Sequence, residues 1–210
     1  MPNSKIFTIG IGGGTGAGKS TLADQISKAL SLTTYHLCTD RYLRDWNDLP
    51  QSAAGLPEMD SPASYFLDEL IRHIDELKDG ETTYLPIYDW QVHQRSPMAE
   101  GVDAPQVLIV EGIIALIDES LRKRYDLKLA VDADPRLRMV RRIESDLSER
   151  NLKMDQIKER LLGSVIPADR DIILRANIFA DISIDGSQGY EQIIDQIRPH
   201  LEARFERSVV

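Results

Sequence analysis

The feature that most constrains the fold is a glycine-rich stretch near the N-terminus, IFTIGIGGGTGAGKST, which spans residues 6–21. Residues 13–20 read GGTGAGKS and satisfy the pattern GxxxxGK[ST]. A short apolar run precedes the glycines, and apolar residues at helical spacing follow them. The stretch therefore predicts a strand, a phosphate-binding loop and a helix.

Such a loop turns its backbone N–H groups inward beside a helix N-terminus, which carries about half a positive charge. A polyphosphate is the expected occupant. We expect Lys19 to reach the β- and γ-phosphates and Ser20 to place its hydroxyl on Mg²⁺. The alternative is a turn that only packs a helix on a sheet, and the strand and helix around the loop argue against it. The residues expected to bind the nucleotide here are Gly13, Gly14, Thr15, Gly16, Ala17, Gly18, Lys19, Ser20 and Thr21.

Length and composition favour one domain over residues 1–210, because a chain of this size can bury a core without disulfides. Cys38 is the single cysteine and cannot form an intrachain disulfide. A net charge of −9 argues against a broad nucleic-acid surface. No apolar run approaches about 18 residues, and residues 1–5 carry no basic cluster. We expect a cytoplasmic protein with no membrane or nucleic-acid partner, and leave homo-oligomerisation open.

Apolar and β-branched runs predict further strands at 33–39, 106–110, 127–131 and 181–184, with helices between them. One helix is expected to start at Ser61-Pro62 and end at 79, two more at Pro135 and Asp155, another after Pro167 and the last at Tyr190. Extended pieces at 82–88 and 90–95 predict a small hairpin. The fold class is therefore α/β: a three-layer P-loop NTPase fold with a mostly parallel sheet of about five strands and helices on both faces.

Two carboxylates follow predicted strands, Asp40 after the second and Glu111 after the buried run 106–110. Ligands gather at the carboxyl edge of a parallel sheet, so both are placed for chemistry. Asp40 could hold the metal through water or accept the proton of an attacking hydroxyl. Its alternative is an ordinary turn or N-cap residue. Glu111 is expected to orient the metal, a position at which aspartate is more usual.

Two further groups of residues leave alternatives open. Tyr88, Trp90 and His93 alternate, so a strand would place them on one face, where they could stack a base or sugar or simply pack an edge strand. Arginines at 136, 138, 141 and 142 form a basic run on one predicted helix. Such a run is usually a solvated face, but on a mobile helix it could close over a polyphosphate.

The order of these motifs resembles the uridine kinase and phosphoribulokinase branch of the P-loop kinases, from about residue 6 to residue 185. That resemblance rests on a set of segments far more specific than the phosphate loop alone. The segments are Thr39–Leu43, Met59–Pro62, Pro86–Arg95, Val107–Gly112 and Val131–Ile143.

The resemblance implies a role for each matching residue. Asp40 would be the catalytic base or a metal-side carboxylate beside the catalytic Lys19, and Ser20 and Glu111 would help to hold Mg²⁺. Residues 136–165 would form a helical lid that carries four arginines. Arg141 and Arg150 would bind ATP, and Arg138 and Arg142 would bind the substrate. An acceptor-site insertion at residues 41–98 would contribute nucleoside contacts from Asp60, Tyr88 and His93, with Asp60 holding ribose hydroxyls.

Several positions depart from the family pattern, mostly on the acceptor side. Arg160 stands where nucleoside kinases commonly have glutamine. The family usually has tyrosine at Leu43, histidine at Ser61, arginine at Ser145 and Leu152, and glycine at Asn151. A few altered hydrogen bonds can change acceptor choice by about 10⁴-fold or more.

The leading function is an ATP-dependent kinase that transfers the γ-phosphoryl group to uridine or cytidine, giving the 5′-monophosphate. Alternatives are the same transfer to another sugar, vitamin or metabolite hydroxyl, as in phosphoribulokinase or pantothenate kinase, or a catalytically weak nucleotide-binding regulator. A nucleotide-dependent switch or motor is less consistent with the sequence. The sequence lacks the guanine-reading NKxD motif, and residue 111 is a glutamate where a motor would more often have an aspartate. The sequence leaves open whether ATP or GTP is the preferred phosphoryl donor.

Overall fold

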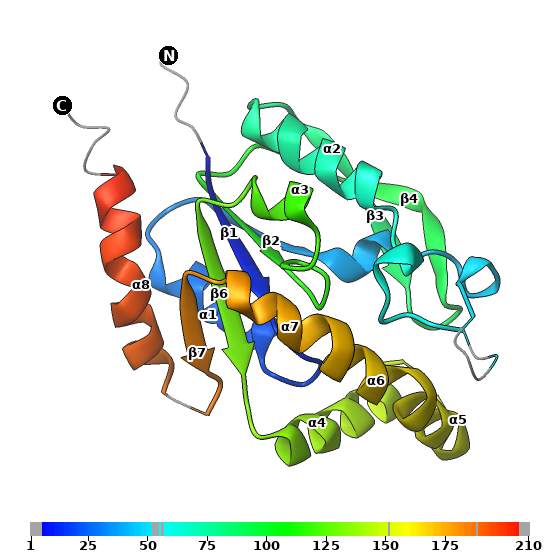
Figure 1. The fold of residues 1–210 in the computed structure, drawn as a ribbon. Helices are drawn as coiled ribbons and strands as arrows, with labels where there is room; N and C mark the ends of the chain where they lie inside the picture. Colours follow the sequence, from blue (N-terminus) through cyan, green and yellow to red (C-terminus); the bar gives the residue numbers. More distant parts are fainter. Residues whose placement is uncertain (1–5, 52–54, 56, 151, 188, 206–210) are drawn as a thin grey trace.

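The computed structural model describes residues 6–51, 55, 57–150, 152–187 and 189–205, and a parallel sheet forms its centre (Figure 1). The sheet order is β2-β5-β1-β6-β7, and every neighbouring pair is parallel. Its strands are β1 (Phe7–Gly12), β2 (Thr34–Cys38), β5 (Val107–Glu111), β6 (Leu127–Asp132) and β7 (Ile182–Asp185). Strands β1 and β5 are buried along their whole length, as their continuous apolar runs predict.

Helices cover both faces of this sheet, which confirms the predicted three-layer α/β class. On one face, α1 (Lys19–Ala29) and α8 (Tyr190–Phe205) pack through Leu22, Ile26 and Ile193 against the strands. On the other face, α2 (Leu67–Lys78) and α3 (Glu119–Arg122) enclose a second apolar cluster. Figure 1 shows α8 beside α1 at one edge and α2 near the opposite edge.

The predicted hairpin is present, but its turn falls at residues 90–93. Strands β3 (Thr83–Asp89) and β4 (Gln94–Val102) pair antiparallel. Asp89 Oδ1 accepts a hydrogen bond from the Gln91 N–H at 2.8 Å, and His93 has a φ of 53°. An aspartate that bonds the backbone two residues on favours a turn. The expected strand at 90–95 is therefore correct only for Gln94 and Arg95, which begin β4, and wrong for 90–93. Trp90 and His93 do not share a strand face with Tyr88.

The helix expected to start at Ser61-Pro62 begins later, at Leu67. Ser61 caps only a 3₁₀ turn, Pro62–Ser64, by accepting from the Ala63 N–H at 3.3 Å. Tyr65 is then extended and forms a bridge with Leu43. This tertiary pairing interrupts the helix that the local sequence favours.

A long helical arm follows β6. Helix α4 (Pro135–Ser148) is capped by Asp134, which accepts from the Arg136 N–H at 2.8 Å. Residues 154–179 are helical throughout, with π turns at Leu161–Val165 and Asp169–Ile173 between α5 (Met154–Arg160), α6 (Ile166–Ala168) and α7 (Leu174–Ala176). The expected break before Pro167 is absent from this arm, and a π turn lies on each side of the short helix that contains the proline. Asn151 lies outside the described residues.

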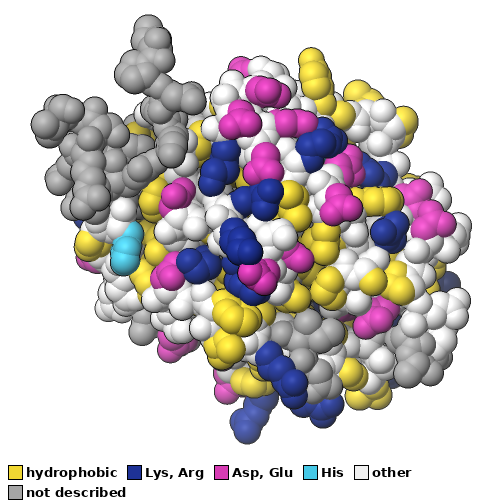
Figure 2. Space-filling view, turned by 45° about the horizontal axis from the view of Figure 1, so that its top comes forward, with side chains coloured by type: hydrophobic (Ala, Val, Ile, Leu, Met, Phe, Trp, Pro, Cys, Tyr) yellow, Lys and Arg dark blue, Asp and Glu magenta, His cyan; other side chains and the backbone are white. Residues whose placement is uncertain are grey.

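Charged side chains of both signs share the surface. Figure 2 shows Lys and Arg side chains intermingled with Asp and Glu over the face it presents. Within the described residues, no helix is long and apolar enough to cross a membrane.

Candidate active site

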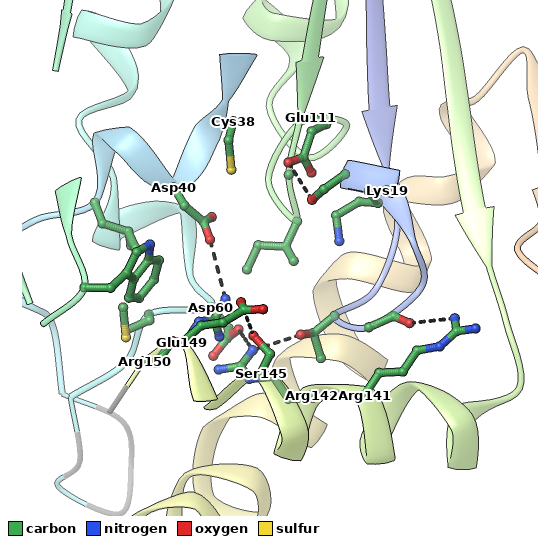
Figure 3. A pocket seen from close by; sticks show the side chains of 18 of the residues that line it. Lys19, Cys38, Asp40, Asp60, Glu111, Arg141, Arg142, Ser145, Glu149 and Arg150 are labelled. Atoms are coloured by element: carbon green, nitrogen blue, oxygen red, sulfur yellow. Dashed lines mark hydrogen bonds and ion pairs between the residues drawn. The ribbon is translucent and has the colours of Figure 1, made fainter. Parts of the chain in front are cut away.

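A pocket of about 300 Å³ opens at the carboxyl edge of the sheet. Figure 3 shows Lys19, Asp40 and Glu111 pointing into the same space, with Arg141, Arg142 and Arg150 approaching from α4 and the residues just after it. Most of the site residues predicted from the sequence line this pocket. They are Thr15, Gly16, Gly18, Lys19, Ser20, Thr21, Asp40, Asp60, Glu111, Arg141, Arg142 and Arg150.

The phosphate loop is shaped by glycine conformations and by a close neighbour. Gly16 has a φ of +70°, and a Cβ on Gly14 would lie 1.4 Å from a guanidinium nitrogen of Arg138. Lys19 Nζ donates to the Gly14 carbonyl at 3.0 Å. Burial lowers the pKa of Lys19, while the charges of Glu111 and Asp40 oppose that shift. The loop therefore holds its lysine against the backbone at the pocket wall.

Ser20, Glu111 and His36 form a connected group beside the lysine. Ser20 Oγ donates to Glu111 Oε1 at 2.9 Å, and His36 Nε2 lies 3.3 Å from the same oxygen. His36 Nδ1 lies 3.2 Å from Asp24 Oδ1 on α1. Burial raises the pKa of Glu111, but the His36 hydrogen bond and the Lys19 charge outweigh it and lower the pKa overall. Glu111 is therefore held as a carboxylate.

His36 was not among the residues predicted from sequence. It lies on β2, beside the buried β5 strand that ends in Glu111. A histidine in a strand next to the one bearing a candidate metal carboxylate is the only sequence signal that could have found it. Its two contacts tie Glu111 to helix α1.

The donor set suits a magnesium ion held jointly with phosphate. No group of three or more His, Cys, Asp or Glu side chains that could hold a metal occurs among the described residues. Mg²⁺ commonly takes one or two protein oxygens and completes its shell with substrate phosphates and water. The Ser20 hydroxyl and the Glu111 carboxylate are hard oxygen donors at the pocket wall, so they fit that pattern.

Asp40 enters the pocket from the 3₁₀ turn that follows β2, Thr39–Tyr42. Tyr65 OH donates to Asp40 Oδ1 at 3.3 Å, and Arg150 NH2 lies 3.7 Å from Oδ2. Burial raises the pKa of Asp40, and the Arg150 cation partly opposes that rise. A carboxylate with a raised pKa is a better proton acceptor than an ordinary aspartate.

The arginines of α4 connect the phosphate loop with the acceptor side. Arg142 NH1 donates to Thr15 Oγ1 at 2.9 Å and lies 3.6 Å from Asp60 Oδ1. Its Nε binds Asp146 at 2.9 Å, and Arg150 NH1 binds the same aspartate at 3.0 Å. Spacings of four residues along the helix bring these charges together.

Arg141 contacts the loop separately. Its NH1 donates to the Gly16 carbonyl at 3.3 Å.

Arg138 was expected to bind the substrate, but its side chain lies outside the pocket wall. Its guanidinium forms a two-point ion pair with Asp169, its residue is 2% exposed, and it does not line the pocket. Asp169 lies in the helical arm and was not predicted from the sequence. The pair packs against Gly14, so in this structure Arg138 supports the phosphate loop from behind.

Tyr88 and His93 also stand back from the pocket wall, which Trp90 lines instead. The Tyr88 ring lies 4.9 Å from that of Trp90, and Arg150 lies over Trp90 at 4.6 Å. The His93 ring lies 5.0 Å from Trp46. The remaining predicted loop residues, Gly13, Gly14 and Ala17, shape the loop without lining the pocket.

The positions that depart from the family pattern are distributed unevenly. Leu43 and Ser145 line the pocket, whereas Ser61 caps the 3₁₀ turn. Leu152 is buried in an apolar cluster of the helical arm. Arg160 is buried beside Met59, which is itself part of the pocket wall.

Comparison with known proteins identifies the family. Residues 8–189 match the model of the phosphoribulokinase/uridine kinase family. The uridine kinase of Bacillus pumilus is 35% identical over 208 residues, covering 97% of this chain and 99% of that protein. The uridine kinase of Chloroflexus aurantiacus is 31% identical over 199 residues, covering 94% of this chain and 95% of that protein.

Solved structures share the fold. Phosphoribulokinase from Rhodobacter spheroides has a TM-score of 0.62 at 18% identity, over 88% of this chain and 74% of that chain. D-glycerate 3-kinase from Cryptococcus neoformans has a TM-score of 0.59 at 13% identity, over 82% of this chain and 80% of that chain. The fold, the phosphate loop and the relatives agree, and the chain belongs to the phosphoribulokinase and uridine kinase family as an ATP-dependent phosphotransferase with a hydroxyl acceptor.

Proposed function

We propose that this kinase transfers the γ-phosphoryl group of ATP to the 5′-hydroxyl of uridine or cytidine. The observation that carries the proposal is the meeting of Lys19, Asp40 and Glu111 in one pocket, with Asp60 on its wall. The uridine kinases that match nearly the whole chain support a pyrimidine nucleoside as the acceptor.

The phosphate loop and Lys19 bind the triphosphate, with Arg141 beside the loop. Lys19 exchanges its contact with the Gly14 carbonyl for phosphate oxygens, where its charge offsets the charge that develops during transfer. Ser20 and Glu111 would hold Mg²⁺, which when bound would neutralise phosphate charge and orient the transferring group. His36 keeps the Glu111 carboxylate in place.

Asp40 acts on the acceptor. Its carboxylate accepts the hydroxyl proton as the hydroxyl oxygen bonds to the γ-phosphorus and the bond to the ADP oxygen breaks. Tyr65 and Arg150 orient the carboxylate through their contacts with its two oxygens. This arrangement favours Asp40 as base over a role as a metal ligand, because Glu111 already provides a carboxylate beside Ser20.

Asp60 binds the ribose hydroxyls, and the hairpin covers the base through Trp90, which lines the pocket, while Tyr88 and His93 pack against the Trp90 ring. Asp60 is 3% exposed, which strengthens a hydrogen bond from a sugar hydroxyl. Arg142 lies between Thr15 and Asp60, so it can couple triphosphate binding to acceptor binding when the lid, residues 136–165, closes.

An ADP-release assay with ATP and Mg²⁺ tests the proposal. Uridine or cytidine should stimulate ADP release strongly over the acceptor-free rate, and adenosine and ribose should not. Stimulation by none of these compounds, with slow intrinsic hydrolysis only, would contradict the proposal and favour a nucleotide-binding regulator.

A further inference from the structure

The ion pair between Arg138 and Asp169 is buried beside the phosphate loop, and the proposed function gives it no part. The two residues are 2% and 6% exposed. Arg138 NH1 donates to Asp169 Oδ1 at 2.9 Å, and NH2 donates to the other carboxylate oxygen. Burial lowers the pKa of Arg138, but the hydrogen bonds and the charge of Asp169 outweigh it and raise the pKa overall. Arg138 therefore stays charged in a fixed two-point geometry.

Asp169 is the main anchor of this arginine. Among the described residues, Arg138 Nε has no hydrogen-bond partner. The other carboxylate within ion-pair distance, Asp132, lies 4.0 Å from Nε on a side chain that is 65% exposed. A buried guanidinium that loses its one close partner becomes an uncompensated charge, which is costly. The position of Arg138 thus depends on Asp169, the first residue of a π turn in the helical arm.

Both partners of the pair touch the phosphate loop. A Cβ on Gly14 would lie 1.4 Å from Arg138 NH1 and 2.2 Å from Asp169 Oδ1, so the pair fills the space that a side chain would need. At Gly16 a Cβ would lie 2.3 Å from the Arg138 carbonyl oxygen. The two glycines therefore allow the loop to approach this closely, and the pair blocks any movement of the loop toward it.

Gly14 connects the pair with the catalytic lysine. Its carbonyl accepts hydrogen bonds from Lys19 Nζ at 3.0 Å and from the Ala17 N–H at 3.2 Å. The charge of Arg138 also adds to burial in lowering the pKa of Lys19. A shift of Gly14 would move the lysine relative to the phosphates that the loop binds, and a misplacement of about 1 Å can cost about 10²-fold in rate.

We propose that Asp169 is a positioning residue for phosphoryl transfer: through Arg138 it fixes Gly14, and through Gly14 it sets the position of Lys19 against the triphosphate. Neither Asp169 nor Arg138 lines the pocket, so they act through the loop and not on the substrates directly. The inference rests on the phosphoryl transfer described above, and it does not depend on which hydroxyl accepts the group.

Asp169→Asn tests this inference, because it keeps the shape of the side chain and removes its charge. We would measure kcat with uridine as acceptor and the Kd for ATP by calorimetry. Turnover should fall by about 10- to 100-fold while the Kd changes by less than about threefold, because the loop amides that bind phosphate remain. Asp169→Glu, which keeps the charge, should recover part of the turnover.

A double-mutant cycle shows whether Asp169 acts through Lys19. In the Lys19→Ala background, Asp169→Asn should lower turnover by less than about twofold further, because the group that it positions is already absent. A merely structural role of Asp169 would instead reduce turnover by the same factor in both backgrounds.

Asp75→Asn is the matched control. Asp75 also forms a two-point pair with an arginine, accepting from Arg124 Nε at 2.7 Å and from NH2 at 2.6 Å, and neither residue lines the pocket. Both variants should lower the Tm, and only Asp169→Asn should lower kcat. ATP-induced thermal stabilisation shows that each variant is folded, and Asp169→Glu takes its place in the cycle if Asp169→Asn is not.

Two results would overturn the inference. One is turnover of folded Asp169→Asn within about twofold of normal. The other is an equal loss of turnover with and without Lys19. If the unchanged protein transfers nothing to uridine, the proposed function fails instead, and the same cycle is measured on intrinsic ATP hydrolysis, so the two failures are distinguishable.

Discussion

The phosphate end and the acceptor end of the pocket are organised differently. At the phosphate end the charged side chains have partners before any ligand binds: Lys19 contacts the Gly14 carbonyl, and Ser20 and His36 both contact Glu111. At the acceptor end, buried polar atoms of Asp60 and Arg160 have none among the described residues. The phosphate end is thus pre-organised, whereas we expect a bound ligand to supply the missing partners at the acceptor end.

This difference explains why one end can be predicted and the other leaves the substrate open. A preformed triphosphate site needs few residues at fixed spacing and serves many kinases. The acceptor end combines side chains from a loop, a hairpin turn and a helical arm, and a change in one of them alters what the site accepts. Variants at the phosphate end should therefore change turnover or magnesium dependence without changing which acceptor is preferred.

The largest effect is expected for Asp40→Asn. Removing a general base costs about 10²- to 10⁴-fold in turnover, and the isosteric amide leaves the triphosphate contacts in place. We expect kcat to fall by that factor while the Kd for ATP, measured by calorimetry, changes little. The control is Asp48→Asn, which alters an exposed aspartate ten residues after the end of β2. Normal turnover in Asp40→Asn would make Asp40 an ordinary turn residue.

Lys19→Ala should come next. A charge about 4 Å from phosphate oxygens is worth up to about 4 kcal/mol at an effective dielectric of 20, which corresponds to about a thousandfold in rate. The KM for the acceptor should stay the same, because Lys19 lies at the phosphate end. Lys28→Ala on the same helix, an exposed position, should match the unchanged protein. Turnover of Lys19→Ala within tenfold of normal would rule out the assigned role.

Glu111→Gln should raise the Mg²⁺ concentration for half-maximal activity by about 10- to 100-fold, because it removes the carboxylate charge at the proposed metal position. The measurement is a Mg²⁺ titration of initial rate at saturating ATP, with EDTA abolishing activity in both proteins. Glu119→Gln, on the surface, is the control. An unaltered Mg²⁺ dependence would place the metal elsewhere.

The smallest effect is expected for His36→Ala. Loss of its hydrogen bond to Glu111 is worth about 1 kcal/mol, or about fivefold in the same Mg²⁺ titration. His36→Gln, which can still donate to Glu111, should recover part of the difference. A shift in acceptor preference instead would show that the two ends are coupled through β2.

Sequence predicts the local parts of this structure well. The strand, loop and helix around Lys19 are fixed by contiguous residues, and the apolar run before Glu111 identifies a buried strand. Tertiary contacts decide what the sequence misses. Pairing of Tyr65 with Leu43 delays helix α2, and a turn capped by Asp89 removes His93 from the predicted strand face.

The same distinction applies to the arginines. Arg142 reaches the pocket beside Asp146, one helical turn further on, so helical periodicity is informative there. Arg150, which follows α4 and was expected from the family resemblance, contacts the same aspartate. Arg138 is held by Asp169, 31 residues away, and no local pattern predicts that partner. The burial of Arg160 likewise depends on Met59, from a loop far away in the sequence.

Single-turnover transfer from ATP labelled at the γ-phosphate tests the central claim most directly. With enzyme in excess over ATP and uridine present, the label should appear in uridine 5′-monophosphate, and Asp40→Asn should slow its appearance by about 10²-fold or more. Label that appears only as inorganic phosphate, at a rate that uridine does not change, would contradict transfer to an acceptor hydroxyl in this pocket.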